Sequence, residues 1–562
     1  MRGGAVGMQS LRNSVWRMEI FLYLCGVNVK LTCEKMTGKW IGAALLAAAM
    51  AMPTRAQNPY LPLWEHIPDG EAYVFDDPDR PGRQRVYLYG SHDNLRTEYC
   101  GRDLVVWSAP VEDLTQWRYD GVIFKSQASR DGKPFRADGK ADVLYAPDVA
   151  VTVESGRKVY YLCPNNQEGG RQTMVARSDR PDGPFSVCNW AADGVSTEGV
   201  WGFDPSLFCD DDGRVYGYWG FERSYAAELD PRTMCTPLAG TRIVEDMISS
   251  NKQRGASRFF EASSMKKILG KYVFIYSRIT EPGEFGLPST NYTLAYAYGD
   301  SPLGPFTYGG TIIDGRGRDT DEQGHVIVTG YRNGNTHGTL AEVNGRWWVF
   351  FHRQSGTNEF ARQPMVAPVE VQRVGDAIVI SEAEVTSEGF QTDGLNPLER
   401  QPAGIACYLT HPEPMTQEYP GYVFKGSYVA ATYVGDNDMD GSYSLNTHHA
   451  PLVNNTAGSV AGYKYFNFDH LASLASPRLC LEMRPLGVKG EIVAMVDSPW
   501  ESKGGRVIGR MALTGDERGE GERAMTLTGL DGLGGKHALY LRFESATPGA
   551  SLCDVYSLVF RP

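Results

Sequence analysis

One short pattern recurs five times along the chain, and it restricts the fold more than any other feature of the sequence. Each copy is an aromatic-rich stretch of four or five residues that follows a single acidic residue or histidine. The stretches lie at 86–89, 159–162, 215–219, 272–276 and 347–351, and the polar residues upstream of them are Asp69, Asp148, Asp204, Glu261 and His337. The offset is about eleven residues in the middle three copies and about ten in the last, and a loop expected at 76–83 lengthens the first. The chain therefore contains repeated supersecondary units.

The length and composition of these units indicate the architecture. Units of about 55 to 75 residues with short strands and Gly/Pro turns are too long for helical solenoid repeats and are typical of four-stranded blades. Five units therefore predict an all-β chain with a five-bladed β-propeller. Because the first strand of each blade lines the central channel, residues at one point of five such strands converge on its axis. We expect three carboxylates and one imidazole to meet there in a single pocket.

The rest of the chain predicts two further parts after the propeller, which we place at 57–393. A Pro-rich, irregular segment at 394–419 is expected to be a linker that packs on the propeller. Beyond it, residues 420–562 alternate short apolar strands with polar turns. This alternation is typical of a β-sandwich, and we expect a jelly-roll-like one.

The first 56 residues predict an export signal behind an upstream extension. Met36 and Lys39 precede an apolar run from Trp40 to Met52, and small residues lead to a cleavage point near Ala56. This order is typical of a signal peptide, and the apolar run is too short to span a bilayer comfortably. We therefore expect Met36 to be the natural start. The mature protein is expected to be secreted, periplasmic or extracellular, and without a membrane anchor.

Charge and cysteine content exclude several classes of function. The formal net charge of -12 argues against a nucleic acid or an anionic membrane as a partner, because either requires a basic face. The cysteines are scattered singly, without the spacing of a zinc site. Cys163, Cys209 and Cys480 lie in apolar runs that favour buried free thiols. We expect a monomer.

Five short motifs, one in each unit, resemble those of a known enzyme family. They are Asn58-Pro-Tyr-Leu-Pro62, Tyr145-Ala-Pro-Asp-Val149, Phe203-Asp-Pro-Ser-Leu-Phe208, Phe259-Phe-Glu-Ala-Ser263 and Gly334-Asn-Thr-His-Gly338. In this order, and over the whole propeller, they resemble the blade motifs of glycoside hydrolase family 43. The resemblance implies a five-bladed propeller with a pocket at one end of its channel, a carbohydrate substrate, and chemistry that requires no cofactor.

The same resemblance implies three catalytic roles. Hydrolysis with inversion needs an acid that protonates the leaving oxygen and a distant base that activates water. A third carboxylate near the acid raises its pKa by like-charge repulsion, so that it keeps its proton near neutral pH. Motif by motif, the resemblance implies that Asp69 is the general base, Asp148 the pKa modulator and Glu261 the general acid. For Asp69, which precedes Gly70 where the family more often has proline, a turn aspartate is the alternative.

Further residues are candidates for binding the substrate, each with a structural alternative. The resemblance implies that Arg362 reaches the sugar, where a guanidinium can hydrogen-bond two hydroxyl groups; a surface ion pair is the alternative. Asp204 is either a substrate contact or a cap at the start of a strand. At the rim of the pocket, the candidates for binding hydroxyl groups are His92, Asp93 and Asn166. The candidate platforms for stacking on a sugar are Trp107, Trp201 and Phe203, for which a place in the hydrophobic core is the alternative.

In the fifth copy of the repeat, His337 occupies the position that an acidic residue has in the other four. On the channel axis it fits a water network or a hydrated cation, and the resemblance associates it with a central calcium or other ion bound through waters. A hydrogen-bonded core histidine is the alternative.

The predicted sandwich resembles carbohydrate-binding modules of family 6, through Gly458-Ser-Val-Ala-Gly-Tyr-Lys-Tyr-Phe466 and the pattern near the C-terminus. Trp500 and Tyr463 are the candidate glycan contacts. A domain that only braces the propeller is the alternative.

These inferences predict a secreted, inverting exo-glycoside hydrolase that removes terminal sugars from plant polysaccharide side chains. An α-L-arabinofuranosidase is favoured, and a β-xylosidase, a β-galactofuranosidase or an exo-β-galactosidase are the alternatives within the family. A non-catalytic glycan-binding propeller is an alternative of another class, although a lectin has no need of a spaced acid and base. A protein-interaction propeller would have no convergent acids.

Overall fold

A computed structural model describes residues 18–24, 27–33, 57–95, 98–131, 143–166, 173–200, 202–249, 255, 257–418, 422–429, 450–472 and 474–562. The chain divides into two units, Met1–Pro53 and Thr54–Pro562. In the smaller unit, β1 (Met18–Leu24) pairs antiparallel with β2 (Val27–Cys33). The expected start at Met36, the apolar run and the cleavage point near Ala56 lie outside the described residues, as does Trp201. In the part of the chain that the structure describes, no helix is long and apolar enough to cross a membrane.

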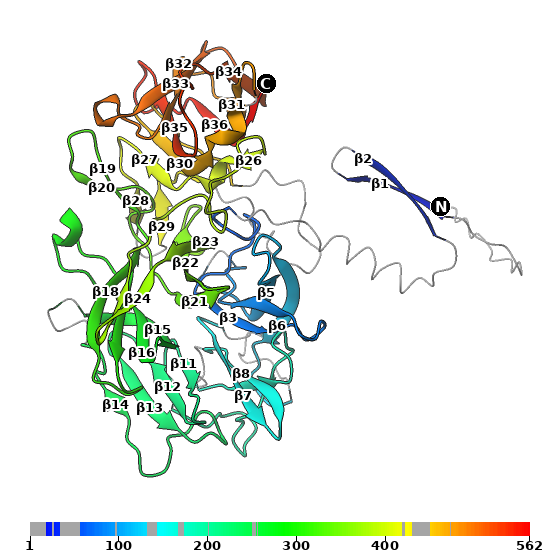
Figure 1. Cartoon of the computed structure of the whole chain (residues 1–562), viewed down its shortest axis with the longest axis vertical. Helices are drawn as coiled ribbons and strands as arrows, with labels where there is room; N and C mark the ends of the chain where they lie inside the picture. The colour runs from blue at the N-terminus through cyan, green and yellow to red at the C-terminus, as the bar shows by residue number, and fades with distance from the viewer. Residues whose placement is uncertain are drawn as a thin grey trace, which may run out of the picture. The chain divides into compact units, whose positions relative to one another are not determined.

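Five antiparallel sheets follow one another along the larger unit, from blue through cyan and green in Figure 1. The first comprises β3 (Glu71–Asp76), β4 (Gln84–Tyr89), β5 (Asp103–Pro110) and β6 (Arg118–Lys125). The second comprises β7 (Asp148–Glu154), β8 (Arg157–Cys163), β9 (Ala176–Ser178) and β10 (Ser186–Val187). The third comprises β11 (Ser206–Cys209), β12 (Val215–Trp219), β13 (Tyr225–Leu229) and β14 (Val244–Glu245). The fourth comprises β15 (Phe259–Ile268), β16 (Lys271–Arg278), β17 (Thr293–Gly299) and β18 (Thr307–Asp314).

The fifth sheet has three strands among the described residues, β21 (Thr339–Val343), β22 (Arg346–Gln354) and β23 (Arg362–Val369). Two hairpins flank it in sequence, formed by β19 (Arg318–Thr320) with β20 (Val326–Val328) and by β24 (Val371–Val374) with β25 (Ala377–Ile380). A short 3-10 helix, η1 (Glu284–Gly286), lies in the fourth blade between β16 and β17.

The first strand of every sheet faces a common channel. Residues of β3, β7, β11, β15 and β21 line one cavity of about 280 Å³. A parallel bridge between Gly70 and Gly338, just before β3 and β21, joins the first sheet to the last. The five sheets therefore close into a ring, and the predicted all-β, five-bladed propeller is confirmed.

The recurring aromatic stretches are the second strands of the blades, and both faces of these strands are covered. In β4, Tyr87 and Tyr89 pack with Tyr160 of the second blade, whereas Leu88 packs with Phe350 of the fifth. A strand buried on both faces reads as a continuous apolar run without polar alternation. Packing between neighbouring blades therefore explains why the repeat is so visible in the sequence.

One buried asparagine ties the start of the propeller to its last blade. The Asn58 side chain donates from Nδ2 to the carbonyl of Val366 in β23 at 2.6 Å and accepts from the Val366 N–H at 3.0 Å. Nδ2 also donates to the carbonyl of Thr386 at 3.0 Å, and the Asn58 N–H donates to that of Ser387 at 2.9 Å. The amide group thus satisfies a backbone edge that would otherwise lack partners.

The C-terminal part is a β-sandwich of two sheets, drawn mainly in orange and red in Figure 1. One sheet comprises β26 (Gln401–Pro402), β36 (Cys553–Arg561), β31 (Arg478–Pro485) and β34 (Gly521–Thr526). The other comprises β27 (Tyr408–Thr410), β30 (Val460–Asn467), β35 (Lys536–Glu544), β32 (Gly490–Val496) and β33 (Arg506–Leu513). Three short 3-10 helices belong to this region, η2 (Ala403–Ile405), η3 (Phe468–Leu471) and η4 (Glu501–Lys503).

The segment expected to be a linker is built into the sandwich. It supplies β26 and β27, which pair with β36 and β30. It also supplies β28 (Thr416–Glu418), which pairs with β29 (Val423–Lys425) as a separate hairpin. Tyr463 is fully buried and donates to the carbonyl of Ala403 at 3.1 Å, so the prediction that Tyr463 contacts glycan is wrong.

Ion pairs and hydrogen bonds join the sandwich to the propeller. The buried Arg353 of β22 donates from Nη1 to the carbonyl of Ala406 at 2.9 Å. Lys464 pairs with Asp319 at 3.1 Å and with Glu384 at 2.9 Å. These contacts lie at the border between the two domains.

We expect Asn58→Ala to lower the thermal midpoint of the full-length protein by several degrees. The substitution leaves the Val366 N–H and two carbonyls without partners in a buried site, at a cost of about 2 to 4 kcal/mol. Differential scanning calorimetry of wild type and variant measures the change. An unchanged midpoint would show that the last blade does not depend on this contact.

Candidate active site

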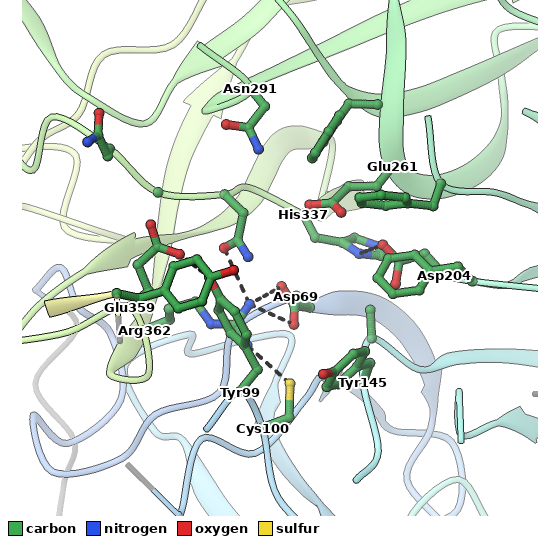
Figure 2. Close-up of a pocket in the computed structure, with 18 of the residues that line it drawn as sticks. Asp69, Tyr99, Cys100, Tyr145, Asp204, Glu261, Asn291, His337, Glu359 and Arg362 are labelled. Atoms are coloured by element: carbon green, nitrogen blue, oxygen red, sulfur yellow. Dashed lines mark hydrogen bonds and ion pairs between the residues drawn. The ribbon is translucent and has the colours of Figure 1, made fainter. Parts of the chain in front are cut away.

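Four of the five polar residues in the repeat register line one pocket. Figure 2 shows Asp69, Asp204, Glu261 and His337 around it, and they come from the starts of β3, β11, β15 and β21. The cavity has a volume of about 580 Å³, which is in the range of small-molecule sites. The predicted residues Phe203 and Arg362 also line it.

Asp69 is held from three sides. Arg362 donates from Nη1 to both carboxylate oxygens, at 3.0 and 3.1 Å, and the Ser91 hydroxyl donates to Oδ2 at 2.6 Å. The Asp69 N–H donates to Nδ1 of His352 at 3.1 Å, while Nε2 of His352 faces the carbonyl of Asn335 at 2.8 Å. This network assigns the ring proton of His352 to Nε2. The position and orientation of the Asp69 carboxylate are therefore set by its neighbours.

The charges around Asp69 keep it ionised. Burial on its own raises the pKa of Asp69, but the charge of Arg362, then that of His337, and the Ser91 hydrogen bond together lower that pKa below its usual value. Burial lowers the pKa of His352 to about 3, so this ring is neutral and accepts the Asp69 N–H. Asp69 is thus a carboxylate that can accept a proton.

Arg362 reaches Asp69 because a second carboxylate positions it. Asp93 accepts from Nε of Arg362 at 2.9 Å and from Nη2 at 2.9 Å, which is a bidentate pair. Asp93, predicted as a substrate contact, is fully buried and is not among the pocket-lining residues. Its carboxylate contacts Arg362 and accepts from the N–H of Cys100 at 3.0 Å.

Glu261 and Asp204 form the opposite side of the pocket in Figure 2. Asp204 accepts from Nδ2 of Asn165 at 3.0 Å and from the N–H of Ala262 at 3.1 Å, so it is tied to the residue that follows Glu261. Burial, then the charges of Asp204 and Asp69, raise the pKa of Glu261 well above its usual value. Glu261 therefore keeps a proton where Asp69 does not.

Backbone conformation explains how the carboxylates reach the pocket. Asp69 and Asp204 each lie two residues before an inner strand, with φ of 59° and 49°. Aspartate tolerates this left-handed region better than most residues, although it remains uncommon there. Beside Glu261, Ala262 has φ of 71° and the pairing of β15 with β16 shifts register. Local departures from regular strand geometry thus accompany all three acids.

Asp148 lies outside this pocket. It is the first residue of β7 and pairs with Cys163, so its backbone continues regularly into the strand. Its carboxylate accepts from the Tyr73 hydroxyl at 2.5 Å and from the N–H of Leu207 at 2.8 Å. Burial, then the charge of Glu71, raise the pKa of Asp148 to about 7. Among the neighbouring charges, Asp204 raises the pKa of Glu261 most, and Asp148 is not one of the main contributors.

His337 links the pocket to the channel behind it. Its Nδ1 lies 3.6 Å from Oδ2 of Asp204, and its Nε2 lies 3.8 Å from Oε1 of Glu71. Both ring nitrogens therefore already face carboxylates. Among the described residues, no group of three or more His, Cys, Asp or Glu side chains is arranged to hold a metal ion. An ion bound to His337 through waters stays a prediction, and the chemistry of the site needs none.

Three other predicted contacts are buried behind the pocket. His92 lies between Asp103, at 2.8 Å from Nδ1, and Glu65, at 3.3 Å from Nε2. Burial alone lowers the pKa of His92, but these two acids raise it to about 10. Trp107 is buried and donates to Glu65 at 2.9 Å, so it is a core residue and not a platform. Asn166 is fully buried, and neither it nor His92 is among the lining residues.

An arc of aromatic side chains extends from Phe203 past Glu261. The ring centroid of Phe203 lies 5.2 Å from that of Phe221, which lies 5.1 Å from that of Phe260. Phe221 is 49% exposed and its loop is held by the Glu222 N–H, which donates to the Phe260 carbonyl at 2.6 Å. Phe221 was not predicted, although an aromatic residue directly after the strand-ending Trp219-Gly220 was a usable signal.

Segments outside the repeat register complete the other wall. Glu359 accepts from the Tyr99 hydroxyl and from Nε2 of Gln417, the latter in β28. Tyr422, 38% exposed, lines the pocket beside β29, and its carbonyl accepts from the Glu359 N–H at 3.2 Å. Figure 2 shows Tyr99 and Glu359 close to Arg362. The sequence carried no signal for these residues, because their segments have no counterpart in the other blades.

The pocket therefore presents an ionised carboxylate and a protonated carboxyl group from different blades. These are the two groups that cleavage of a glycosidic bond needs, one to accept a proton from water and one to protonate the leaving oxygen. The aromatic arc offers surfaces on which the C–H faces of sugars stack.

Known proteins resemble this chain in sequence and in structure. The sequence profile of "Glycosyl hydrolases family 43" matches residues 76–375. A "Xylosidase/arabinosidase" of Thermoclostridium stercorarium is 32% identical over 437 residues, which cover 74% of this chain and 84% of that protein. "Xylosidase/arabinosidase 43A" of Humicola insolens is 31% identical over 333 residues, 50% of this chain and 86% of that protein. A solved family 43 arabinoxylan arabinofuranohydrolase from Bacillus subtilis, in complex with cellotetraose, aligns with 19% identity and a TM-score of 0.42 over 88% of this chain and 96% of that one. The chain belongs to glycosyl hydrolase family 43 and is a glycosidase.

Proposed function

We propose that this glycosidase is exo-acting and releases terminal arabinofuranose or xylose units from plant polysaccharide chains, with α-L-arabinofuranosidase activity favoured. The observation that carries the proposal is the pairing of an ionised Asp69 with a protonated Glu261 in one pocket. The relatives named xylosidase/arabinosidase support this choice of sugars. A β-galactofuranosidase or exo-β-galactosidase is the runner-up, supported by a relative from Aspergillus niger named β-D-galactofuranosidase, 24% identical over 358 residues.

In the proposed mechanism, Asp69 accepts a proton from a water molecule that attacks the anomeric carbon. Glu261 donates its proton to the glycosidic oxygen as the bond breaks. Arg362 and Ser91 hold the Asp69 carboxylate in place throughout. Attack by water from the face opposite the leaving group inverts the anomeric configuration.

We assign the role of pKa modulator to Asp204 and not, as the sequence predicted, to Asp148. Asp204 lines the pocket and contributes the largest charge effect on the pKa of Glu261. Asp148 is fixed in the channel wall by Tyr73 and by the N–H groups of Val149 and Leu207.

Phe221 and Phe260 are proposed to bind the leaving group. The acid protonates the leaving oxygen, so the departing unit must lie on the Glu261 side of the pocket. Phe260 precedes Glu261 directly, and Phe221 exposes its ring next to Phe260. A sugar ring that leaves past Glu261 would stack on this surface.

The sandwich is proposed to brace the propeller through Arg353, Lys464 and their partners. Glycan binding by a module like those of family 6 stays a prediction, with half-buried Trp500 as its remaining candidate. Export and a monomeric state likewise stay predictions from the sequence.

A screen of aryl glycosides tests the proposed activity. We expect hydrolysis of an aryl α-L-arabinofuranoside or β-D-xylopyranoside, with NMR detecting the inverted anomer as the first product. Glu261→Ala should lower kcat/KM about 10²- to 10⁴-fold for substrates with poor leaving groups, and much less for dinitrophenyl glycosides, which need no acid. Asp69→Asn should lower kcat/KM for both. Retention of configuration, or full activity in both variants, would contradict the mechanism.

The pH dependence distinguishes the two aspartates. Replacing Asp204 by Asn removes a negative charge beside Glu261, so the pKa of Glu261 falls and its proton is lost at lower pH. The alkaline limb of kcat/KM against pH should therefore move down by about one unit or more in Asp204→Asn. Asp148→Asn is the matched control and should leave this limb in place. A shift in Asp148→Asn alone would restore the role predicted from the sequence.

A substrate without a leaving sugar tests the aromatic surface. Phe221→Ala should lower kcat/KM about 10-fold for an oligosaccharide that the wild type cleaves. The fluoride of the same terminal sugar has no leaving sugar to stack, so its hydrolysis should be unchanged. Equal losses on both substrates would place Phe221 at the terminal sugar instead.

A further inference from the structure

A lysine ammonium lies in the propeller channel behind the pocket. Nζ of Lys266, in β15, is 3.1 Å from Oε2 of Glu71 and 3.6 Å from the ring centroid of Tyr73, both in β3. The Lys266 side chain is 13% exposed and that of Glu71 is fully buried. Because β15 and β3 belong to the fourth and first blades, this contact crosses the channel.

The ammonium faces a channel that holds two buried carboxylates. Glu71 contacts it directly, and Asp148 accepts a hydrogen bond from the hydroxyl of Tyr73, whose ring contacts the ammonium. Buried carboxylates without a cation are strongly destabilising. A cation close to the face of an aromatic ring gains a further favourable interaction.

The contacts continue from the channel into the pocket as a row of alternating charge. Oε1 of Glu71 lies 3.8 Å from His337, and the other ring nitrogen of His337 lies 3.6 Å from Asp204. The row therefore runs Lys266, Glu71, His337, Asp204, and it ends beside Glu261. The proposed mechanism assigns no role to Lys266 or Glu71.

We propose that Lys266 is a built-in cation of the propeller axis, which takes the place of a bound divalent ion. A calcium ion takes six to eight oxygen ligands. Here the two oxygens of Glu71 already face Lys266 and His337, and a divalent ion between them would meet a positive charge on the Lys266 side. The propeller channel is stable without a bound metal, and this proposal does not depend on which sugar the enzyme cleaves.

Metal analysis of the wild type gives the first test. After gel filtration in metal-free buffer, the full-length protein should contain far less than one equivalent of calcium or any other divalent metal by mass spectrometry. Its thermal midpoint should not change with EDTA or with millimolar Ca²⁺. One equivalent of bound metal, or a midpoint that falls on chelation, would overturn the proposal.

Two neighbouring lysines give a matched pair of variants. Lys266→Met keeps the stem and removes the charge from the channel, whereas Lys267→Met makes the same change at a lysine paired with Asp210 and Asp211. Lys266→Met should lose about 3 °C or more of thermal midpoint and regain part of it in millimolar Ca²⁺, which can now bind Glu71. Lys267→Met should show no response to Ca²⁺.

Equal midpoints and equal indifference to Ca²⁺ in the two variants would overturn the proposal. Should Lys266→Met fail to fold, the metal content and chelator response of the wild type still decide it. Neither readout depends on activity, so a failed substrate screen leaves this test intact.

Discussion

The convergence of buried acids on one axis is the constraint on which the rest of the structure depends. Asp69, Glu71, Asp148, Asp204 and Glu261 are all at most 9% exposed. Like charges at such a site cannot all be ionised unless cations are close. The fold places Arg362 on Asp69 and Lys266 on Glu71, whereas the charges that act most strongly on Glu261 are those of Asp204 and Asp69. Which acid keeps its proton follows from this distribution of partners, as in other sites where two carboxyl groups take opposite roles.

The propeller was predictable because packing and chemistry repeat with the same period. The second strand of each blade is buried between two neighbours, so it must be apolar on both faces, as Tyr87 and Leu88 illustrate. The first strands all begin at the same end of the channel, and Asp69, Asp204, Glu261 and His337 each lie two residues from the first residue of such a strand. A periodic sequence can report both facts without any knowledge of the fold.

The contrast between Asp148 and Asp204 shows where this period stops being informative. Asp148 and Asp204 stand at the same offset of about eleven residues from their aromatic strands. Asp204 has a left-handed backbone and points into the pocket, whereas Asp148 is the first residue of a regular strand and binds Tyr73. Backbone conformation therefore distinguishes the two positions, and residue spacing does not record it. Tyr99 and Glu359 were missed for another reason, because no other blade carries a copy of their loops.

The hairpin of β28 and β29 lies between the propeller and the sandwich in sequence, yet Tyr422 lines the pocket and Gln417 donates to Glu359 in its wall. The border between the two domains thus passes through the substrate site. Exchange of C-terminal domains between relatives, whether by recombination or by engineering, would replace part of the pocket together with the appended module.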